Sequence, residues 1–392
     1  MTKLDQLINE LCPDGVEYKA LGDFVTITRG GNFQKKDFTE IGVPCIHYGQ
    51  IYTRYGLFAN QTITSISKEA ANKSKFASQN DIIMAVTSEN VEDVCKSVAW
   101  LGSDDIAVSG HTAIIRHNQN PKYLSYYFHS SMFFAQKVKL AHGTKVIEVT
   151  PDKLKNILIP LPPLPVQQEI VRILDNFTEL TAELTAELTA ELTARKKQYE
   201  YYRDELLSID NETRYVALDD ICEISRGRVM SKEYLRDNAG EYPVYSSQTA
   251  NNGIFGFIDS FDYEDESITW TTDGANAGSV FYHVNEKFSI TNVCGLLRVV
   301  NKSEVNTRFV YYVLQVVAKK YVSSGMGNPK LMSNVMARVK IPLPPLEKQN
   351  RIVAILDQFD TLCNDLTSGI PAEIEARRKQ YEYYRDKLLT FK

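Results

Sequence analysis

The hexapeptide Ile159-Pro-Leu-Pro-Pro-Leu164 stands a second time in the chain as Ile341-Pro-Leu-Pro-Pro-Leu346. Ile173-Leu-Asp-Asn-Phe177 returns in the same way as Ile355-Leu-Asp-Gln-Phe359. Both pairs share one offset of 182 residues (341 minus 159). Long matches in a single register indicate that the chain contains a duplicated unit.

Two further repeats extend the duplication. The block Arg195–Leu207 recurs as Arg377–Leu389 at the same offset, and Ala20–Gly30 resembles Ala217–Gly227. The chain therefore reads as variable block, shared block, variable block, shared block, which predicts one scaffold that carries two different surfaces. The predicted segments are a first head, a helical spacer, a second head and a second helical spacer: 1–158, 159–213, 214–340 and 341–392.

The shared blocks predict long helices. Pro165 suits the first turn of a helix, where its missing N–H costs nothing. Leucines four residues apart in a Thr-Ala-Glu-Leu repeat continue the helical pattern and form a slowly winding stripe: Leu180, Leu184, Leu188 and Leu192. A helix from Val166 to Leu207 would measure roughly 60 Å. In the second copy Gly369-Ile370-Pro371 predicts a break, with Ser368 or Gly369 as a cap.

The variable blocks predict mixed strands and helices. Runs rich in β-branched residues predict strands at 24–28, 81–87, 97–101 and 113–117, and in the second block at 221–225, 267–271, 280–284 and 295–300. The stretches 123–140 and 307–321 follow helical spacing. This mixture predicts an α/β (α+β) head in each half.

Composition is that of a globular protein with a locally acidic spacer. A chain of 392 residues exceeds one compact core, so two or three domains are expected. The net charge is −5. Formal counting places about 17 basic and 16 acidic groups in 1–158 and about 14 of each in 214–340, but about 5 basic and 11 acidic groups in 159–213. The heads are therefore close to neutral, and the acidic excess belongs to the spacer, which leaves room for a local cationic face on each head.

Several function classes lack their motifs. The sequence has no run of eighteen apolar residues and no secretory pattern at Met1–Cys12, so we expect a cytoplasmic protein. Six scattered cysteines form no Cys-x-x-Cys pair, and the six histidines lack metal-ligand spacing. A Walker phosphate loop and the Asp/Asn-Pro-Pro-Tyr tetrapeptide of amino-methylating enzymes are both missing from the sequence. We expect no catalytic residue, no metal site and no cofactor bound by this chain.

The first head offers side chains suited to nucleic acid. Arg29-Gly30-Gly31 follows a predicted strand, and glycine lets a backbone approach phosphate while arginine forks onto phosphate or guanine. A turn with a solvated arginine is the plainer interpretation. The other candidates supply cations, amides or aromatic rings: Lys35, Lys36, His47, Tyr48, Gln50, Arg54 and Lys145. Core packing is the alternative for Tyr48.

The second head repeats the pattern with different residues. Arg226-Gly227-Arg228 matches the first arginine motif in place. The further candidates for DNA contact are Tyr245, Gln248, Asn251, Asn276 and Lys330. Tyr245 could instead pack in the core, and Asn251-Asn252-Gly253 could be only a hairpin turn.

The duplicated Ile-Pro-Leu-Pro-Pro-Leu block, with its following glutamine and Ile-Leu-Asp, resembles the specificity subunits of type I restriction-modification systems along nearly the whole chain. The tandem Thr-Ala-Glu-Leu spacer resembles one branch of that family. The resemblance implies two α/β target recognition domains joined by two long antiparallel coiled-coil helices, with an internal pseudo-two-fold repeat. It also implies that the protein binds a bipartite, asymmetric site on double-stranded DNA.

The resemblance further implies partner subunits. Two modification (methyltransferase) subunits would dock on the scaffold, carry S-adenosylmethionine and methylate adenine. Restriction subunits, which use ATP and Mg²⁺, would complete the endonuclease. The spacer residues expected to serve the scaffold or the docking of partners are the four leucines, Leu180 to Leu192, with Tyr199, Arg203, Tyr381 and Arg385. Simple coiled-coil packing is the alternative for these tyrosines and arginines.

Three other functions are compatible with parts of the sequence. A free-standing binding protein or antirestriction decoy would share the scaffold but would not copurify with methyltransferase subunits. A fused methyltransferase or nuclease would act alone, which the missing motifs disfavour. A purely structural coiled-coil adaptor would leave two large heads unexplained.

Overall fold

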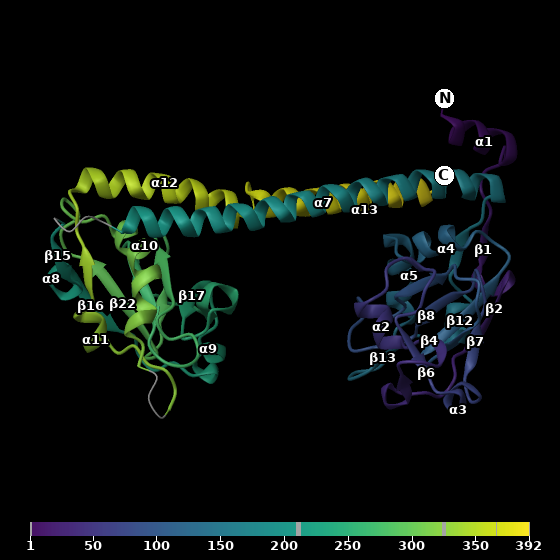
Figure 1. The fold of residues 1–392 in the computed structure, drawn as a ribbon, viewed down its shortest axis with the longest axis horizontal. Helices are drawn as coiled ribbons and strands as arrows, with labels where there is room; N and C mark the ends of the chain where they lie inside the picture. The colour runs from purple at the N-terminus through teal and green to yellow at the C-terminus, as the bar shows by residue number, and fades with distance from the viewer. Residues whose placement is uncertain (1, 209–212, 324–326, 366, 392) are drawn as a thin grey trace. The chain divides into compact units, whose positions relative to one another are not determined.

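The computed structural model describes residues 2–208, 213–323, 327–365 and 367–391. Its contacts divide the chain into two compact units, which Figure 1 draws. Unit 1 comprises Met1–Glu187 with Ile374–Lys392, and unit 2 comprises Leu188–Glu373. Each unit contains one head and parts of the shared helices. The four segment boundaries predicted above stay a prediction, because this division assigns each spacer partly to both units.

The head of unit 1 contains two five-stranded sheets. The first has the strand order β2-β12-β8-β10-β5, and the second has the order β3-β6-β4-β11-β7. Their bounds are β2 Val25–Arg29, β3 Phe38–Thr39, β4 Val43–Ile46, β5 Phe58–Ala59, β6 Thr64–Ile66, β7 Lys75–Ala77, β8 Ile82–Ala85, β10 Ser97–Trp100, β11 Ile106–Val108 and β12 Thr112–His117. Two-stranded sheets join β1 (Tyr18–Ala20) to β14 (Leu158–Pro160) and β9 (Thr87–Ser88) to β13 (Ile147–Glu148). The predicted strands near 24, 81, 97 and 113 are confirmed to within a residue or two.

Short helices complete this head. They are α1 Lys3–Leu11, η1 Leu21–Asp23, η2 Lys35–Asp37, α2 Tyr48–Thr53, α3 Lys68–Ala71, α4 Pro121–Phe128, α5 Ser131–Leu140 and α6 Pro151–Leu154. The single helix predicted over 123–140 is two helices. The chain leaves helical geometry at Ser130, whose Oγ accepts from Phe133 N and so caps α5. Ser130 is buried, and it also donates to the carbonyl of Tyr127.

Unit 2 has a smaller head of the same kind. Its sheets have the orders β16-β22-β19-β20, β18-β17-β21 and β15-β23. The bounds are β15 Tyr215–Ala217, β16 Cys222–Arg226, β17 Tyr242–Tyr245, β18 Ile254–Ile258, β19 Ser267–Thr271, β20 Val280–His283, β21 Ser289–Ile290, β22 Cys294–Val299 and β23 Lys340–Pro342. Its helices are α8 Leu218–Ile221, α9 Lys232–Asp237, η3 Ala250–Gly253, α10 Thr307–Val317, η4 Ala318–Tyr321 and α11 Ser333–Ala337. The four strands predicted in this block are confirmed.

The shared helices are α7 (Leu164–Leu207), α12 (Leu346–Asn364) and α13 (Ile370–Leu389). The 44 residues of α7 correspond to roughly 66 Å. The break predicted at Gly369-Ile370-Pro371 is confirmed, because α13 begins at Ile370. No helix in the described ranges combines the length and the apolar character needed to cross a membrane.

An antiparallel helix pair is present in each unit. In unit 1 the hydroxyls of Thr178 and Tyr381 lie 3.0 Å apart, and the rings of Phe177 and Tyr384 lie 5.9 Å apart. The residue numbers on α13 thus fall as the residue numbers on α7 rise, as expected for antiparallel helices. In unit 2 the rings of Tyr199 and Tyr202 on α7 pack against Phe359 on α12, at 6.3 and 5.8 Å. The predicted fold class, two mixed α/β heads on antiparallel helices, is confirmed.

The duplicated motif ties each head to its helix. Ile159 and Ile341 are fully buried in matching two-stranded sheets, which pair β1 with β14 and β15 with β23. The glutamine that follows is buried in both copies. Gln167 Nε2 donates to the carbonyl of Pro162 at 2.7 Å, and Gln349 Nε2 donates to that of Pro344 at 2.7 Å.

The other end of each glutamine holds the head. Its Oε1 accepts the backbone N–H of Asn120 in unit 1 and of Asn306 in unit 2, at 3.1 and 2.8 Å. Each of these asparagines caps a helix of its head, α4 or α10. A buried amide with both ends bonded orients its neighbours. The repeat is therefore a head-to-spacer joint used twice.

Candidate nucleic-acid interface

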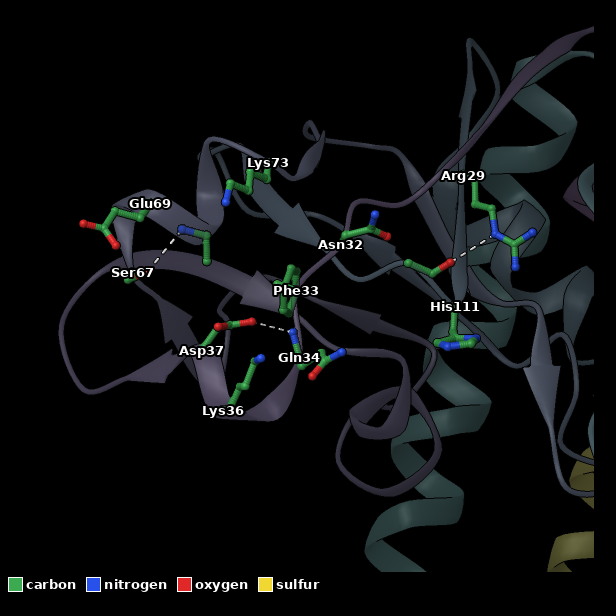
Figure 2. Close-up of a pocket in the computed structure, with 12 residues that line it drawn as sticks. Arg29, Asn32, Phe33, Gln34, Lys36, Asp37, Ser67, Glu69, Lys73 and His111 are labelled. Atoms are coloured by element: carbon green, nitrogen blue, oxygen red, sulfur yellow. Dashed lines mark hydrogen bonds between the residues drawn. The ribbon is translucent and has the colours of Figure 1, made fainter.

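A polar cavity of about 620 Å³ opens in the head of unit 1 (Figure 2). Its lining comes from the segment after β2, from α3 and the turn that follows it, and from the turn between β11 and β12. The lining residues are Arg29, Asn32, Phe33, Gln34, Lys36, Asp37, Ser67, Glu69, Ala70, Lys73, Gly110 and His111. Three cations, two carboxylates and two amides make this a surface suited to a polar, anionic ligand.

Strand geometry positions Arg29 at this cavity. Arg29 ends β2 and pairs with Ala113 of β12. Its Nε donates to the carbonyl of Gly110 at 3.1 Å, and its Nη2 donates to Glu148 Oε1 at 3.1 Å. The side chain remains 51% exposed, so the guanidinium is held at two points and still reaches solvent. Figure 2 shows it at one side of the cavity.

The two glycines after Arg29 serve the packing of the chain. A Cβ at Gly30 would lie 2.0 Å from the carbonyl oxygen of Ser109, and one at Gly31 would lie 2.3 Å from Ser74 Cα. Any side chain would therefore push these segments apart. The structure explains both glycines by close backbone approach within the head. The predicted approach of Gly30 to phosphate stays untested.

Polar groups left free by the fold lie around the cavity. Lys36 and Lys73 form no ion pair with any described residue, and Asn32 and Gln34 are exposed. Lys35 is exposed on η2 beside Lys36. Figure 2 shows Lys73 and Lys36 on different sides of Phe33. Cations and amides without internal partners keep their binding capacity for a ligand.

His47 and Gln50 are used by the fold. His47 caps α2: its Nδ1 accepts from Gly49 N at 3.2 Å, and its own N–H donates to Gln50 Oε1 at 3.0 Å. Gln50 Nε2 donates to Thr64 Oγ1 at 3.1 Å. Burial, together with the nearby Lys35 charge, lowers the pKa of His47 to about 4, so the ring is neutral at pH 7. Direct base contact by either residue stays a prediction.

Tyr48 borders a second, smaller cavity in the same head. This cavity, of about 340 Å³, is lined by Tyr48, Tyr52, Thr87, Ser88, Glu89, Asn90, Asp93, His111 and Val146. The ring of Tyr48 lies 4.9 Å from that of His111, which also lines the larger cavity. Lys145 is exposed in the hairpin that brings Glu148 to Arg29. Arg54 is exposed at the end of α2.

Unit 2 places three of its predicted residues, Arg226, Lys330 and Arg228, in two clusters. Arg226 ends β16, donates to Thr272 Oγ1 at 3.1 Å and to the carbonyl of Asn292, and lies 3.6 Å from Asp273. Lys330 lies 3.7 Å from the same carboxylate. Asn276 is exposed three residues after Asp273. The second cluster is centred on Arg228, which donates to Asp262 at 3.1 Å and to the hydroxyl of Tyr234 at 2.9 Å.

The remaining predicted residues of unit 2 serve local structure. Tyr245 is 6% exposed, and its hydroxyl donates to Glu286 at 2.8 Å. Gln248 donates to the carbonyl of Ile254. Asn251 and Asn252 have φ of 52° and 53°, the left-handed conformation of a turn. Packing and turn formation, the alternatives stated above, thus account for Tyr245 and Asn251, and their contact with DNA stays a prediction.

The spacer residues divide into packed and exposed sets. Tyr199 and Tyr381 are half-buried, and each lies under the arginine of its own repeat, Arg203 at 5.6 Å and Arg385 at 5.9 Å. Leu184, Leu188 and Leu192 are half-buried, whereas Leu180 is exposed. The two tyrosines that follow in each repeat lie within the predicted stretches from Tyr199 to Arg203 and from Tyr381 to Arg385, but they were not named singly. Tyr201 and Tyr383 are 65% and 62% exposed, and Tyr202 and Tyr384 are 39% and 41% exposed.

Other cavity residues were missed because no local pattern marks them. Lys73, in the turn after α3, and His111, in the turn between β11 and β12, reach the cavity through tertiary packing, which periodicity does not predict. Asn32 and Gln34 flank the predicted Arg-Gly-Gly motif, and their neighbourhood was the available signal. Within the ranges that the structure describes, no group of His, Cys, Asp and Glu is arranged to hold a metal ion.

Comparisons with known proteins agree on one family. The model of the type I restriction modification DNA specificity domain matches residues 13–194 and again 211–376. One putative type I specificity subunit of Mycoplasma pneumoniae is 44% identical over 247 residues, which are 61% of this chain and 98% of that protein. A second from the same organism is 46% identical over 240 residues, 59% of this chain and 92% of that one.

A solved structure agrees with the fold. It is described as "Structural basis underlying complex assembly and conformational transition of the type I R-M system". The match has a TM-score of 0.70 and 20% identity, and it covers 96% of this chain and 98% of the other. At that identity the likeness bears on the fold alone.

Proposed function

The chain belongs to the type I restriction-modification specificity family, and we propose that each of its heads binds one half of a bipartite, asymmetric site on double-stranded DNA. It is the DNA-specificity subunit of such a system and is not itself an enzyme. It directs adenine methylation or restriction by partner subunits. It acts in the cytoplasm, where bacterial DNA lies.

The observation that carries the DNA proposal is the cavity of unit 1. Arg29, Lys36 and Lys73 supply charge for phosphate, and Asn32 and Gln34 supply amides that can pair with the edge of adenine. The lining is polar and lies on segments between strands, where base readers are held by a rigid frame. Unit 2 supports the same role with different chemistry, through Arg226, Arg228 and Lys330.

The site proposal covers two sets of residues. The DNA-contacting set is Arg29, Gly30, Lys35, Lys36, His47, Tyr48, Gln50, Arg54, Lys145, Arg226, Arg228, Tyr245, Gln248, Asn251, Asn276 and Lys330, to which the structure leads us to add Asn32, Gln34 and Lys73. The structural roles of His47, Gln50, Tyr245 and Gln248 make them supports of the contacting residues. Different residues in the two heads predict two different half-sites.

We also propose two docked methyltransferase subunits. Equal exposure of Tyr201 and Tyr383, and of Tyr202 and Tyr384, supports two like docking surfaces. The scaffold-side set is Leu180, Leu184, Leu188, Leu192, Tyr199, Arg203, Tyr381 and Arg385. Partner subunits hold S-adenosylmethionine, ATP and Mg²⁺. Restriction subunits join them, and the chain itself binds none of these cofactors.

We propose that the tandem Thr-Ala-Glu-Leu spacer assigns the chain to one branch of the family. In this branch the number of repeats determines the distance between the two half-sites on DNA. One unit adds four residues, or roughly 6 Å of helix, close to two base-pair rises of about 3.4 Å. The repeats lie within α7, which is helical without interruption from Leu164 to Leu207. Because the helix is continuous, adding or removing one repeat would change its length by one full unit of four residues.

Reconstitution tests the proposal. The chain is coexpressed with the methyltransferase subunits of its own system, purified, and supplied with S-adenosylmethionine and host DNA. We expect adenine methylation by the complex and none by the chain alone. Methylation by the chain alone would identify a fused enzyme. Failure to copurify with those subunits would favour the free-standing decoy.

A further inference from the structure

An open groove lies where α7 meets α12 in unit 2. It has a volume of about 580 Å³ and is lined by Glu205, Leu206, Ser208, Pro345, Glu347, Lys348, Arg351, Ile352 and Ile355. Ile352 is 3% exposed, and Ile355 and Leu206 are half-buried, so the floor is apolar. Glu205, Glu347, Lys348 and Arg351 are exposed at its edges.

The duplication supplies an internal comparison for this groove. At the offset of 182 residues, Lys348, Arg351, Ile352 and Ile355 match Val166, Glu169, Ile170 and Ile173 of unit 1, and Leu206 matches Leu388. Two of these counterparts, Val166 and Glu169, are covered where Lys348 and Arg351 are exposed, whereas Ile173 and Leu388 are half-buried like Ile355 and Leu206. Val166 is fully buried, and Glu169 is only 4% exposed although it carries a charge.

The helix α1 covers the counterpart surface in unit 1. Lys3 Nζ lies 3.0 Å from Glu169 Oε2. Leu4, Leu7 and Ile8 of α1 belong to the same hydrophobic cluster as the counterparts of the groove floor, which are Val166, Ile170, Ile173 and Leu388. The apolar residues of α1 recur at the spacing of one helix face. A short amphipathic helix therefore fills this position in unit 1.

Unit 2 has no room for its own copy of α1. In unit 1 the nine residues of α1 precede β1, whereas in unit 2 only residues 208–214 join α7 to β15. These seven residues cannot provide a nine-residue helix and also the connection. The segment 208–214 therefore supplies no counterpart of α1 for the groove of unit 2.

The charges of the groove select the kind of helix. Where unit 1 has Glu169 to pair with Lys3, unit 2 has Arg351, which forms no ion pair with any described residue. The buried Val166 is replaced by the exposed Lys348. The α1 of a second copy would bring Lys3 against Arg351, and like charges in contact oppose binding.

We propose that the groove between α7 and α12 in unit 2 docks an amphipathic helix of a partner protein that carries an acidic residue where α1 carries Lys3. The partner helix presents an apolar face to Ile352, Ile355 and Leu206 and a carboxylate to Arg351 and Lys348. This mode is helix-in-groove recognition. The inference concerns residues of α7 and α12 and the turns beside them, and it does not depend on how DNA is read.

Two peptides test the proposal. One has the sequence of residues 2–12, and the other has the same sequence with Lys3→Glu; both have serine at position 12 to remove the thiol. Each keeps Thr2 and Asp5, whose mutual hydrogen bonds cap α1. Binding to the full chain is followed by the methyl NMR signals of Ile352 and Ile355, assigned with Ile→Val variants. We expect saturable shifts at both methyls and at least fivefold tighter binding of the Lys3→Glu peptide.

Arg351→Glu provides the decisive comparison. A glutamate in the first turn also favours helix formation, so a higher affinity alone could reflect peptide helicity. When the chain carries Arg351→Glu, the order of the two binding affinities must reverse, so that the unaltered peptide binds more tightly than the Lys3→Glu peptide. Lys232→Glu, an exposed lysine on α9 of the same unit, is the matched control and must keep the original order.

Three results would overturn the proposal. The first is that neither peptide shifts the methyl signals of Ile352 and Ile355. The second is that Arg351→Glu leaves the order of the peptide affinities unchanged. The third is tighter binding of the unaltered peptide to the unchanged chain, which would indicate the α1 of a second copy as the occupant. If Arg351→Glu perturbs methyl signals throughout the chain, Lys348→Glu takes its place, with the same weakening of the Lys3→Glu peptide expected.

Discussion

Arg29 and Arg226 occupy matching places at the ends of β2 and β16, and each is held by a turn carbonyl and a carboxylate. The carboxylate is Glu148 of β13 in unit 1 and Asp273, just after β19, in unit 2. A guanidinium that is already oriented loses less side-chain entropy when it binds phosphate or guanine. The two heads thus orient an arginine guanidinium at the same position, with hydrogen-bonding partners that come from different elements.

Base reading by the cavity of unit 1 is testable with its amides. For Asn32→Ala with Gln34→Ala we expect about 1–3 kcal/mol less discrimination at a base pair of one half-site, because an amide can pair with an adenine edge. The other half-site must keep its sequence. Competition binding with single-base variants of the site measures this, and Asn334→Ala, an exposed amide on α11, is the control.

Lys73→Ala separates phosphate contact from base contact in the same cavity. We expect weaker binding to all sequences alike and a decrease of about one in the salt slope. A change in sequence preference with Lys73→Ala, or none with the amide pair, would contradict the assignment of roles.

The buried histidines predict acid sensitivity. Burial lowers the pKa values of His47, His117 and His129 to about 4 in the folded chain, below the ordinary 6.5. The unfolded chain then binds more protons between pH 6.5 and 4, so the free energy of unfolding falls as pH decreases through this window. His47→Asn removes one such group and keeps an acceptor that can cap α2.

Urea unfolding at several pH values measures the effect of His47→Asn. We expect the loss of stability from pH 6.5 to 4 to be shallower than in the unchanged chain, by up to about 1.4 kcal/mol per pH unit. An unchanged slope would show that His47 does not titrate in this window.

The site was only partly predictable from residue type. Arg29 and Lys36 were found because they follow a strand in a short motif. His47 and Gln50 carry the right groups for base reading, but the capping box of α2 uses both. Lys73 entered the site through the packing of α3 and the turn that follows it, a tertiary effect without a local sequence signal.

At the scale of elements, long and repeated patterns were the predictable ones. The strand at 267–271 and the helix break before Ile370 were both confirmed. The second sheet of unit 1 was largely missed, because strands such as β3 and β6 have two or three residues and show no alternation. The break between α4 and α5 depends on one buried serine, which periodicity alone does not reveal.

The spacer helix makes a prediction at this scale. Deletion of Thr181–Leu184 removes one Thr-Ala-Glu-Leu unit and shortens α7 by roughly 6 Å. We expect the gap between the half-sites to change by about two base pairs while both half-sites keep their sequences. Sequencing of methylated adenines measures both quantities. An unchanged gap would contradict the proposal that the length of the spacer sets the separation of the half-sites.

At the scale of the whole molecule, the duplication predicts partner stoichiometry. Tyr201→Ala and Tyr383→Ala each remove one exposed ring from a matching surface, and truncation of an aromatic anchor can cost 2 kcal/mol or more of binding free energy. We expect either variant to bind one methyltransferase subunit where the unchanged chain binds two. Native mass spectrometry of the complex counts the subunits, and two bound to both variants would place docking elsewhere.

Sequencing of methylated adenines in the native genome, with this gene present and deleted, tests the central claim most directly. The account predicts a two-part motif with unequal halves and a fixed gap, present only with the gene. Exchange of head 214–340 for another should change one half alone. A methylation pattern that is the same with and without the gene, or a single uninterrupted motif, would contradict it.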